Sequence, residues 1–318
     1  MTFSSNLVPT LFFAALGLAT APQAQTLTPT SLGLRADMRP DRRPDGYTIV
    51  SGFNSDALHV YVTATGAFER TVAPVPGAQS VVTGADGLLY VCAEKVDEIL
   101  RIDPVTWTIL GPFVGDDPLT PVDETGGLDG PTGALFGPDG NLYVASFNTD
   151  EVLRYDGSTG AFLDVFVAAG SGGLNGPDAG LAFGADGHLY VPSFFTNSVL
   201  RYDGTTGASL GAFATAAPGN LRQPRGLVFH EGFCYVASSQ NNRVLQYELD
   251  GTFVRNYSFA NQVYGLAFHP QDEDLYLVSL GLTTVRRHDG ASGVFQRTLF
   301  PAGSGGLVGA VYLHFWIP

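Results

Sequence analysis

The chain has 318 residues, of which 45% are hydrophobic and only 14% are charged. A chain of this length and composition can bury a large hydrophobic core as one domain. Its formal net charge of −14 and its isoelectric point near 4.6 oppose contact with a phosphate backbone, so we do not expect nucleic acid as a partner.

The N-terminal residues 1–24 have the pattern of an export signal. LVPTLFFAALGLAT is an apolar run too short to span a bilayer comfortably, and it leads into small residues around Ala21 and Ala24. We expect cleavage after Ala24 and a Pro-rich linker at residues 25–43. The mature protein is then secreted or periplasmic and is not inserted in a membrane. A short buried strand or helix is the alternative for this segment.

After the linker, the chain is built from repeats. The stretch DGNLYVASFNTDEVLRYDGSTGAF, which opens at Asp139, returns as DGHLYVPSFFTNSVLRYDGTTGAS from Asp186. The same register recurs at steps of 41–53 residues, a spacing typical of one blade in a β-propeller. The positions that mark it are Ile49, Tyr90, Tyr143, Tyr190, Tyr235 and Tyr276.

Each repeat contains apolar runs separated by turn signals. GALFGPDGNLYVASF has two short apolar stretches around Pro-Asp-Gly, and VLRYDGSTGAFLDVF has two more around Asp-Gly. The pattern predicts four antiparallel strands per repeat and an all-β fold. Because the short aspartate side chain suits turn geometry, much of the negative charge belongs to the turns.

The first and last repeats are both incomplete. Residues 45–72 hold only the second, third and fourth strands, and the C-terminal GLVGAVYLHF supplies an innermost strand with no partner after it. We predict that the two parts form one blade of a six-bladed propeller covering residues 44–318. Closing the ring in this way removes the free sheet edges of an open array. We expect the protein to be a monomer.

Two features of the repeat are assigned to the scaffold. Cys92 and Cys234 fall on second strands of blades on opposite sides of the ring, so we expect buried free thiols and no disulfide. An arginine followed two residues later by an aspartate recurs on third strands, which favours structural salt bridges along one strand face. These pairs are Arg101 and Asp103, Arg154 and Asp156, and Arg201 and Asp203.

The repeat resembles those of six-bladed NHL-type propellers, a superfamily that includes streptogramin B lyases and gluconolactonase-like enzymes. The resemblance covers residues 45–316, and it indicates the fold more strongly than the function, because propellers host many unrelated activities. In these enzymes the chemistry lies at the top of the central channel.

Neither enzyme's motif is present at the matching positions. A lyase would have histidines at the channel mouth together with a metal, whereas the histidines here fall on other strands and turns: His59, His188, His230, His269, His288 and His314. A gluconolactonase-like enzyme would hold a divalent metal with carboxylates, and the matching positions here are serines: Ser146, Ser193, Ser238 and Ser279.

Positions that differ between equivalent blades are the candidates for ligand contact, because residues shared by every blade serve packing. Just before the innermost strands the chain has Gln79, Thr132, Asp178, Arg225 and Tyr264, with Val308 in the composite blade. The loops after the second strands are rich in amides, among them Asn54, Asn148, Asn197, Asn241 and Asn242. We predict a ligand-binding mouth at the top of the channel.

The sequence thus favours a binding scaffold for a protein, a glycan or a small molecule. The alternatives are a metal-assisted lyase or lactonase with rearranged ligands, and a structural envelope or matrix protein. We expect no cofactor other than a divalent cation such as Ca²⁺ in the loop between blades two and three. That loop offers the oxygen ligands of Asp116, Asp117, Asp123 and Glu124.

Overall fold

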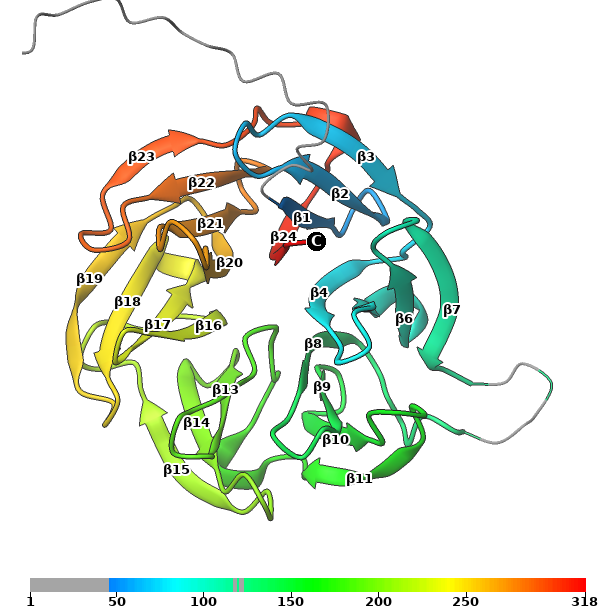
Figure 1. Ribbon diagram of the computed structural model, residues 1–318. Coiled ribbons are helices and arrows are strands. Elements are labelled where there is room, and N and C mark those ends of the chain that lie inside the picture. The colour runs from blue at the N-terminus through cyan, green and yellow to red at the C-terminus, as the bar shows by residue number, and fades with distance from the viewer. Residues whose placement is uncertain (1–45, 117–118, 120–122) are drawn as a thin grey trace, which may run out of the picture. The chain divides into compact units, whose positions relative to one another are not determined.

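The computed structural model describes residues 46–116, 119 and 123–318. In these residues six four-stranded antiparallel sheets are arranged as the blades of a ring (Figure 1). The predicted all-β, six-bladed propeller is confirmed. The predicted signal peptide 1–24 and linker 25–43 lie outside the described residues.

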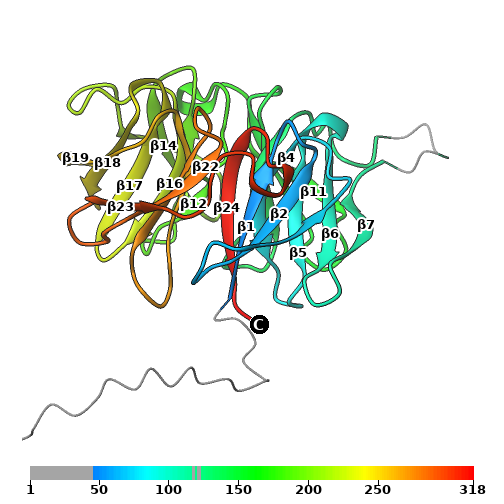
Figure 2. The same cartoon turned by 90° about the horizontal axis from the view of Figure 1, so that it is seen from above.

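Each blade runs from an innermost strand at the channel to an outermost strand at the rim (Figures 1 and 2). Blade one is β24 (Ala310–Trp316), β1 (Tyr47–Gly52), β2 (Ala57–Val62) and β3 (Phe68–Val72). Blade two is β4 (Ala78–Thr83), β5 (Leu89–Ala93), β6 (Glu98–Asp103) and β7 (Thr108–Val114). Blade three is β8 (Pro131–Phe136), β9 (Leu142–Ser146), β10 (Glu151–Tyr155) and β11 (Phe162–Val167).

The other three blades follow the same order. Blade four is β12 (Ala182–Phe183), β13 (Leu189–Ser193), β14 (Ser198–Tyr202) and β15 (Ser209–Ala214). Blade five is β16 (Pro224–His230), β17 (Phe233–Ser238), β18 (Arg243–Glu248) and β19 (Phe253–Phe259). Blade six is β20 (Val263–Phe268), β21 (Leu275–Ser279), β22 (Thr284–His288) and β23 (Phe295–Thr298). Short 3₁₀ helices are η1 (Glu94–Val96), η2 (Ser171–Gly173), η3 (Ser239–Asn241) and η4 (Ser304–Gly306).

No helix in the described ranges is long and apolar enough to cross a membrane.

The ring is closed by the last strand of the chain. β24 pairs antiparallel with β1, from Tyr47 opposite Trp316 to Gly52 opposite Ala310. The predicted composite blade is therefore confirmed, and the inner edge of β1 is covered by hydrogen bonds to β24.

The features that recur along the sequence hold the blades together. The Tyr143 hydroxyl donates to Asp139 of the Asp-Gly turn at 3.0 Å, and this carboxylate also accepts the Asn141 amide at 3.1 Å. The Ser146 hydroxyl accepts the Asp129 amide at 3.0 Å and donates to the Asp129 carbonyl at 3.1 Å. Because equivalent bonds occur in other blades, these repeated polar residues belong to the scaffold.

The prediction that each arginine pairs with the aspartate two residues later was wrong. Arg154 and Arg201 pair with other aspartates. Arg154 pairs with Asp164 on the neighbouring β11, with Nη2 and Oδ2 2.5 Å apart, while Asp156 accepts backbone amides of its own turn. Arg201 is 3.9 Å from Asp186, across the blade. Asp103 ends its strand, and Asp156 and Asp203 directly follow theirs, so each accepts backbone amides of its turn.

The two cysteines match the prediction. Cys92 on β5 and Cys234 on β17 are both buried free thiols, and burial raises the pKa of each well above its usual range. They belong to hydrophobic clusters packed between neighbouring blades. Both thiols are protonated at neutral pH and are inert packing residues.

Candidate ligand-binding cavity

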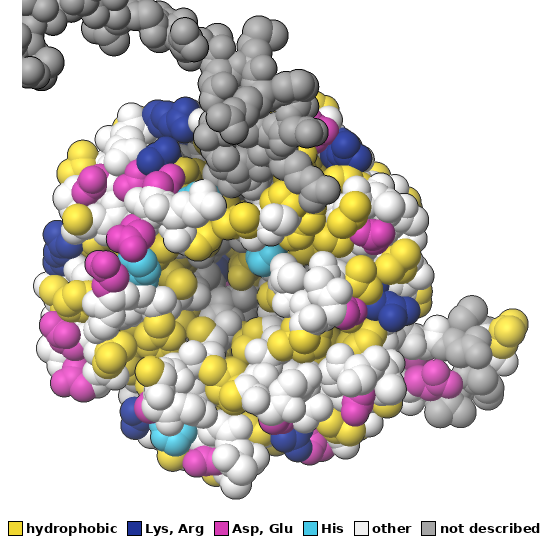
Figure 3. Space-filling model, viewed as in Figure 1, with side chains coloured by type: hydrophobic (Ala, Val, Ile, Leu, Met, Phe, Trp, Pro, Cys, Tyr) yellow, Lys and Arg dark blue, Asp and Glu magenta, His cyan; other side chains and the backbone are white. Residues whose placement is uncertain are grey.

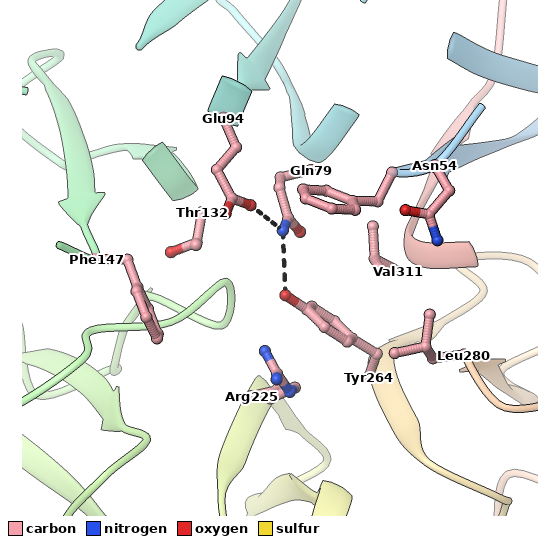
Figure 4. Close-up of a pocket in the computed structure, with 10 residues that line it drawn as sticks. Asn54, Gln79, Glu94, Thr132, Phe147, Arg225, Tyr264, Leu280 and Val311 are labelled. Atoms are coloured by element: carbon pink, nitrogen blue, oxygen red, sulfur yellow. Dashed lines mark hydrogen bonds between the residues drawn. The ribbon is translucent and has the colours of Figure 1, made fainter. Parts of the chain in front are cut away.

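A cavity of about 350 Å³ lies where the innermost strands begin (Figure 4). Four of the five predicted inner-strand residues line it: Gln79, Thr132, Arg225 and Tyr264. The remaining lining residues are Phe53, Asn54, Glu94, Phe147, Leu280 and Val311. Figure 3 shows the opposite face of the ring, where β24 ends; acidic and basic side chains are scattered over its blades and its centre is hollowed.

Apart from Asn54, the lining comes from two positions that are equivalent between blades. The first lies near the start of the innermost strand and is held by Gln79 on β4, Thr132 on β8, Arg225 on β16, Tyr264 on β20 and Val311 on β24. The second directly follows the second strand and is held by Phe53, Glu94, Phe147 and Leu280. The strands of every blade run in the same order from centre to rim, so equivalent positions lie at the same level around the channel. Residues at these two positions therefore meet at the cavity.

Two residues of the predicted inner ring were placed in the wrong register. In the composite blade the lining residue is Val311, and Val308 is 50% exposed in the loop before β24. In blade four the equivalent of Thr132 is Ala179. Asp178 precedes it and is fully buried.

Asp178 is an extra residue in the inner strand of blade four. In blade three, Pro131 lies opposite Ser146, and only Thr132 separates Pro131 from Gly133. In blade four, Pro177 lies opposite Ser193, but both Asp178 and Ala179 separate it from Gly180. The extra residue interrupts strand pairing, which leaves β12 only two residues long. It also turns the carboxylate toward the neighbouring blade.

The buried carboxylate forms an ion pair with Arg225 of blade five. Asp178 Oδ2 is 2.7 Å from Arg225 Nη1, and Oδ1 accepts the Ala179 amide at 2.7 Å. The guanidinium lies between the rings of Phe194 and Tyr264, at 4.3 and 4.2 Å from their centroids. Both faces of Arg225 are therefore covered by aromatic rings.

The pKa values of this pair reflect burial and mutual attraction. Burial raises the pKa of Asp178, and the charge of Arg225 and the bond from Ala179 act in the opposite direction. Burial opposes the charge of Arg225, but Tyr264, Asp178 and Glu94 outweigh it and raise the pKa of the guanidinium. Arg225 therefore stays charged.

A second polar group is joined by the amide of Gln79. Its Nε2 donates to Glu94 Oε2 and to the hydroxyl of Tyr264, the latter at 3.2 Å (Figure 4). Gln79 is only 3% exposed, and its Oε1 has no hydrogen-bond partner among the described residues. Burial raises the pKa of Glu94, and the bond from Gln79 opposes this. Glu94 thus lines the cavity beside the unpaired amide oxygen of Gln79, which is a second hydrogen-bond acceptor.

Among the predicted asparagines of the top loops, Asn54 lines the cavity, whereas the others hold the loops. Asn148 donates to Asp129 at 2.7 Å, Asn197 accepts the Gln223 amide at 2.9 Å, and Asn241 donates to the Asn220 carbonyl at 2.5 Å. Of the amides in these loops, Asn54 is the one at the cavity.

Sequence reasoning missed the position after the second strand. In equivalent places this position holds Phe53, Phe147, Phe194 and Leu280, against Glu94 in blade two and Ser239 in blade five. The criterion used for the inner strands, that equivalent positions disagree, would have found Glu94 if it had been applied here. Of the apolar members, Phe53, Phe147 and Leu280 line the cavity between the polar residues.

A metal site is not assembled in the described ranges. No group of three or more His, Cys, Asp or Glu side chains there is arranged to hold an ion. In the acidic loop, Asp116 accepts the Glu124 amide at 2.8 Å and Asp123 accepts the Thr125 amide at 2.9 Å. Asp117 lies outside the described residues, so the predicted cation loop stays a prediction.

Comparison with known proteins supports the fold. No family model matches the chain, and no curated protein sequence does. Similar solved structures include a protein of unknown function from Bacteroides caccae (16% identity, TM-score 0.63, 85% of this chain and 98% of that one). A chain of a nidogen/laminin complex has 12% identity and a TM-score of 0.64 over 85% and 98% of the two chains. Virginiamycin B lyase from Staphylococcus aureus has 14% identity and a TM-score of 0.55 over 81% and 85%. At these identities the likeness shows a six-bladed propeller fold shared with lyases and with a protein-complex component, and the expected NHL-type resemblance holds at that level.

Proposed function

We propose that the protein binds a small organic molecule in its central cavity. The observation that carries this proposal is the polar network of Glu94, Gln79, Tyr264, Arg225 and Asp178, which crosses four blades at a cavity that apolar side chains also line. A cavity of about 350 Å³ with mostly apolar lining and a few convergent polar groups has the usual features of a ligand site.

The energetics of the network support a role beyond stability. An ion pair as deeply buried as Asp178 and Arg225 loses much of its attraction to desolvation, and apolar side chains of similar volume often stabilise a fold as well or better. The ring itself does not require charge at this level, because blade one places Val311 there and blade three places Thr132. A charged network at a level where other blades have apolar or neutral side chains supports a role in binding.

A second candidate is a lyase or lactonase, and Glu94 is the observation that favours it. A carboxyl group whose pKa is raised by burial at a cavity wall is a suitable general base. Two of the similar structures are named as lyases, one of virginiamycin B and one of streptogramin B. Metal analysis of the purified protein separates the two candidates, since a stoichiometric divalent ion supports the metal-assisted enzyme.

We also propose that the protein carries out this binding function outside the cytoplasm. The support is the apolar run and small residues that end at Ala24. Mass spectrometry of the protein exported by its native host is expected to show a chain that begins at Gln25. An intact N-terminus in the cytoplasmic fraction would contradict export.

Ligand-observed NMR with two simple probes tests cavity binding. We expect saturation transfer from the protein to 2-phenylethylamine or to its neutral analogue 2-phenylethanol. Each is small enough for the cavity, and its ring can pack against the apolar lining residues. Asn54→Trp fills the rim of the cavity and is expected to weaken binding at least about tenfold.

Asn148→Trp is the matched control, because Asn148 is the equivalent loop residue in blade three and does not line the cavity. It is expected to leave binding unchanged. Equal binding by the wild type and Asn54→Trp would place the probes elsewhere on the protein and overturn the proposal.

A further inference from the structure

We infer that the cavity selects a ligand with an amine or another cationic hydrogen-bond donor at one end and an apolar group at the other. This inference rests on the proposed binding function and names the class of ligand. It follows from the charges, the hydrogen-bond groups and the apolar surface of the cavity, taken in turn.

The charges at the cavity leave one carboxylate uncompensated. Asp178 and Arg225 neutralise each other at 2.7 Å. Glu94 contacts the neutral amide of Gln79. The neighbouring Lys95 turns away from it, because its Nζ is 2.7 Å from Asp56 and 3.0 Å from the Phe53 carbonyl. A cation entering the cavity therefore gains a direct partner in Glu94.

The hydrogen-bond groups on the same side are acceptors. Gln79 uses its amide nitrogen for Glu94 and Tyr264, and the opposite orientation would aim its oxygen at the Glu94 carboxylate. Gln79 Oε1 is thereby left buried without a donor among the described residues, beside the carboxylate. A ligand with two or more N–H groups can satisfy both acceptors, and a buried unsatisfied acceptor is costly.

An anionic ligand is disfavoured although Arg225 lines the cavity. The rings of Phe194 and Tyr264 pack against the guanidinium, its Nε is buried without a hydrogen-bond partner among the described residues, and its Nη1 is bound to Asp178. A carboxylate or phosphate would have to compete with this buried partner and would also approach Glu94. The net charge of −14 also favours a cation over an anion, because it attracts cations over a longer range.

Apolar side chains between the polar ones accommodate the apolar part of the ligand. Phe53, Phe147, Leu280 and Val311, from blades one, three and six, line the cavity around Glu94 and Tyr264 (Figure 4). The ring of Phe53 already has a cation near it, since Lys95 Nζ is 4.8 Å from its centroid. Aromatic rings beside a carboxylate favour a cation with an attached hydrocarbon body.

The test compares one cationic and one neutral probe of the same shape. Dissociation constants of 2-phenylethylamine and 2-phenylethanol are measured by NMR titration at pH 7.5 for the wild type and for Glu94→Gln. We expect the wild type to bind the amine at least about tenfold more tightly than the alcohol, and Glu94→Gln to reduce this ratio to about one. Melting curves confirm that the variant is folded.

Glu98→Gln is the matched control, because it changes the net charge equally and Glu98, on β6 of the same blade, does not line the cavity. It is expected to keep the preference for the amine. A preference that survives Glu94→Gln, or tighter binding of 3-phenylpropionate than of the amine by the wild type, would overturn the inference.

The two proposals fail in different ways. If neither probe binds, or if binding survives Asn54→Trp, the cavity is not the binding site and the proposed function fails. If both probes bind equally and Asn54→Trp blocks both, the cavity binds ligands without selecting a cation, and only the present inference fails.

Discussion

Blades three and four are close copies in sequence, yet their innermost strands differ. β9 and β13 have the same length, and so do β10 and β14. At the channel, however, β8 has six residues and β12 has two. The difference comes from one extra residue, Asp178, which replaces regular strand pairing with a buried carboxylate.

The same two blades contain two ion pairs that differ in environment. Arg154 and Asp164 of blade three pair on the outer strands, where their side chains are 22% and 46% exposed. Asp178 of blade four pairs with Arg225 at the channel, where the carboxylate has no exposure. The two pairs have similar distances but different energetics, because desolvation acts much more strongly on the inner pair.

The largest expected effect is the loss of the inner arginine. Arg225→Met leaves Asp178 buried without its partner, so we expect the free energy of unfolding to fall by about 3–5 kcal/mol in urea denaturation. The double variant Asp178→Asn, Arg225→Met removes both charges and is expected to recover part of this loss. A decrease below about 1 kcal/mol for the single variant would show that the inner pair resembles the outer one.

Removal of the hydroxyl of Tyr264 is expected to have the next largest effect. Tyr264→Phe deletes the acceptor of Gln79 Nε2 inside the buried network, and we expect a loss of about 1–2 kcal/mol in the same assay. Tyr143→Phe is the control on the scaffold, because its hydroxyl donates to Asp139 at a partly exposed turn. A larger loss for Tyr143→Phe would contradict the distinction between network and turn.

The outer pair is expected to contribute little. Asp164→Ala removes the partner of Arg154 at the exposed rim, where water replaces the lost contact, and we expect a change below about 1 kcal/mol. Thermal unfolding at low and high salt gives a further check, since added salt is expected to reduce this small difference. A loss equal to that of Arg225→Met would refute the comparison.

The smallest expected effect is a pH dependence of amine binding. The pKa of Glu94 is raised by burial, against the bond from Gln79, with Asp178 raising it further and Arg225 and Lys95 lowering it. Protonation removes the charge that attracts the amine, so affinity for 2-phenylethylamine is expected to fall as the pH is lowered toward and through this raised pKa. Affinity for 2-phenylethanol, and both affinities in Glu94→Gln, should stay constant over the same titration.

Much of the candidate site could be anticipated from positions where equivalent blades disagree. Gln79, Thr132, Arg225 and Tyr264 were found in this way and all line the cavity. The same reasoning could not tell that most of the top-loop asparagines lie outside the site. The amide of a loop asparagine can bind a ligand or hold the loop by the same kind of hydrogen bond. Hydrogen bonds such as that from Asn148 to Asp129 decide between the two roles.

The sequence by itself determined the blade, the number of blades and the closure of the ring. Turns, strand pairs and tyrosine-aspartate bonds connect residues close together in the chain, as in Tyr143 and Asp139. The repeat therefore displays them, and the tyrosine-aspartate bond recurs in blades two, three, four and six. Only the tertiary structure decided the cavity. Its contacts join residues far apart, 185 positions for Gln79 and Tyr264 and 47 for Asp178 and Arg225. Such contacts depend on how the blades meet around the channel, and a one-residue insertion changes their register without altering the repeat.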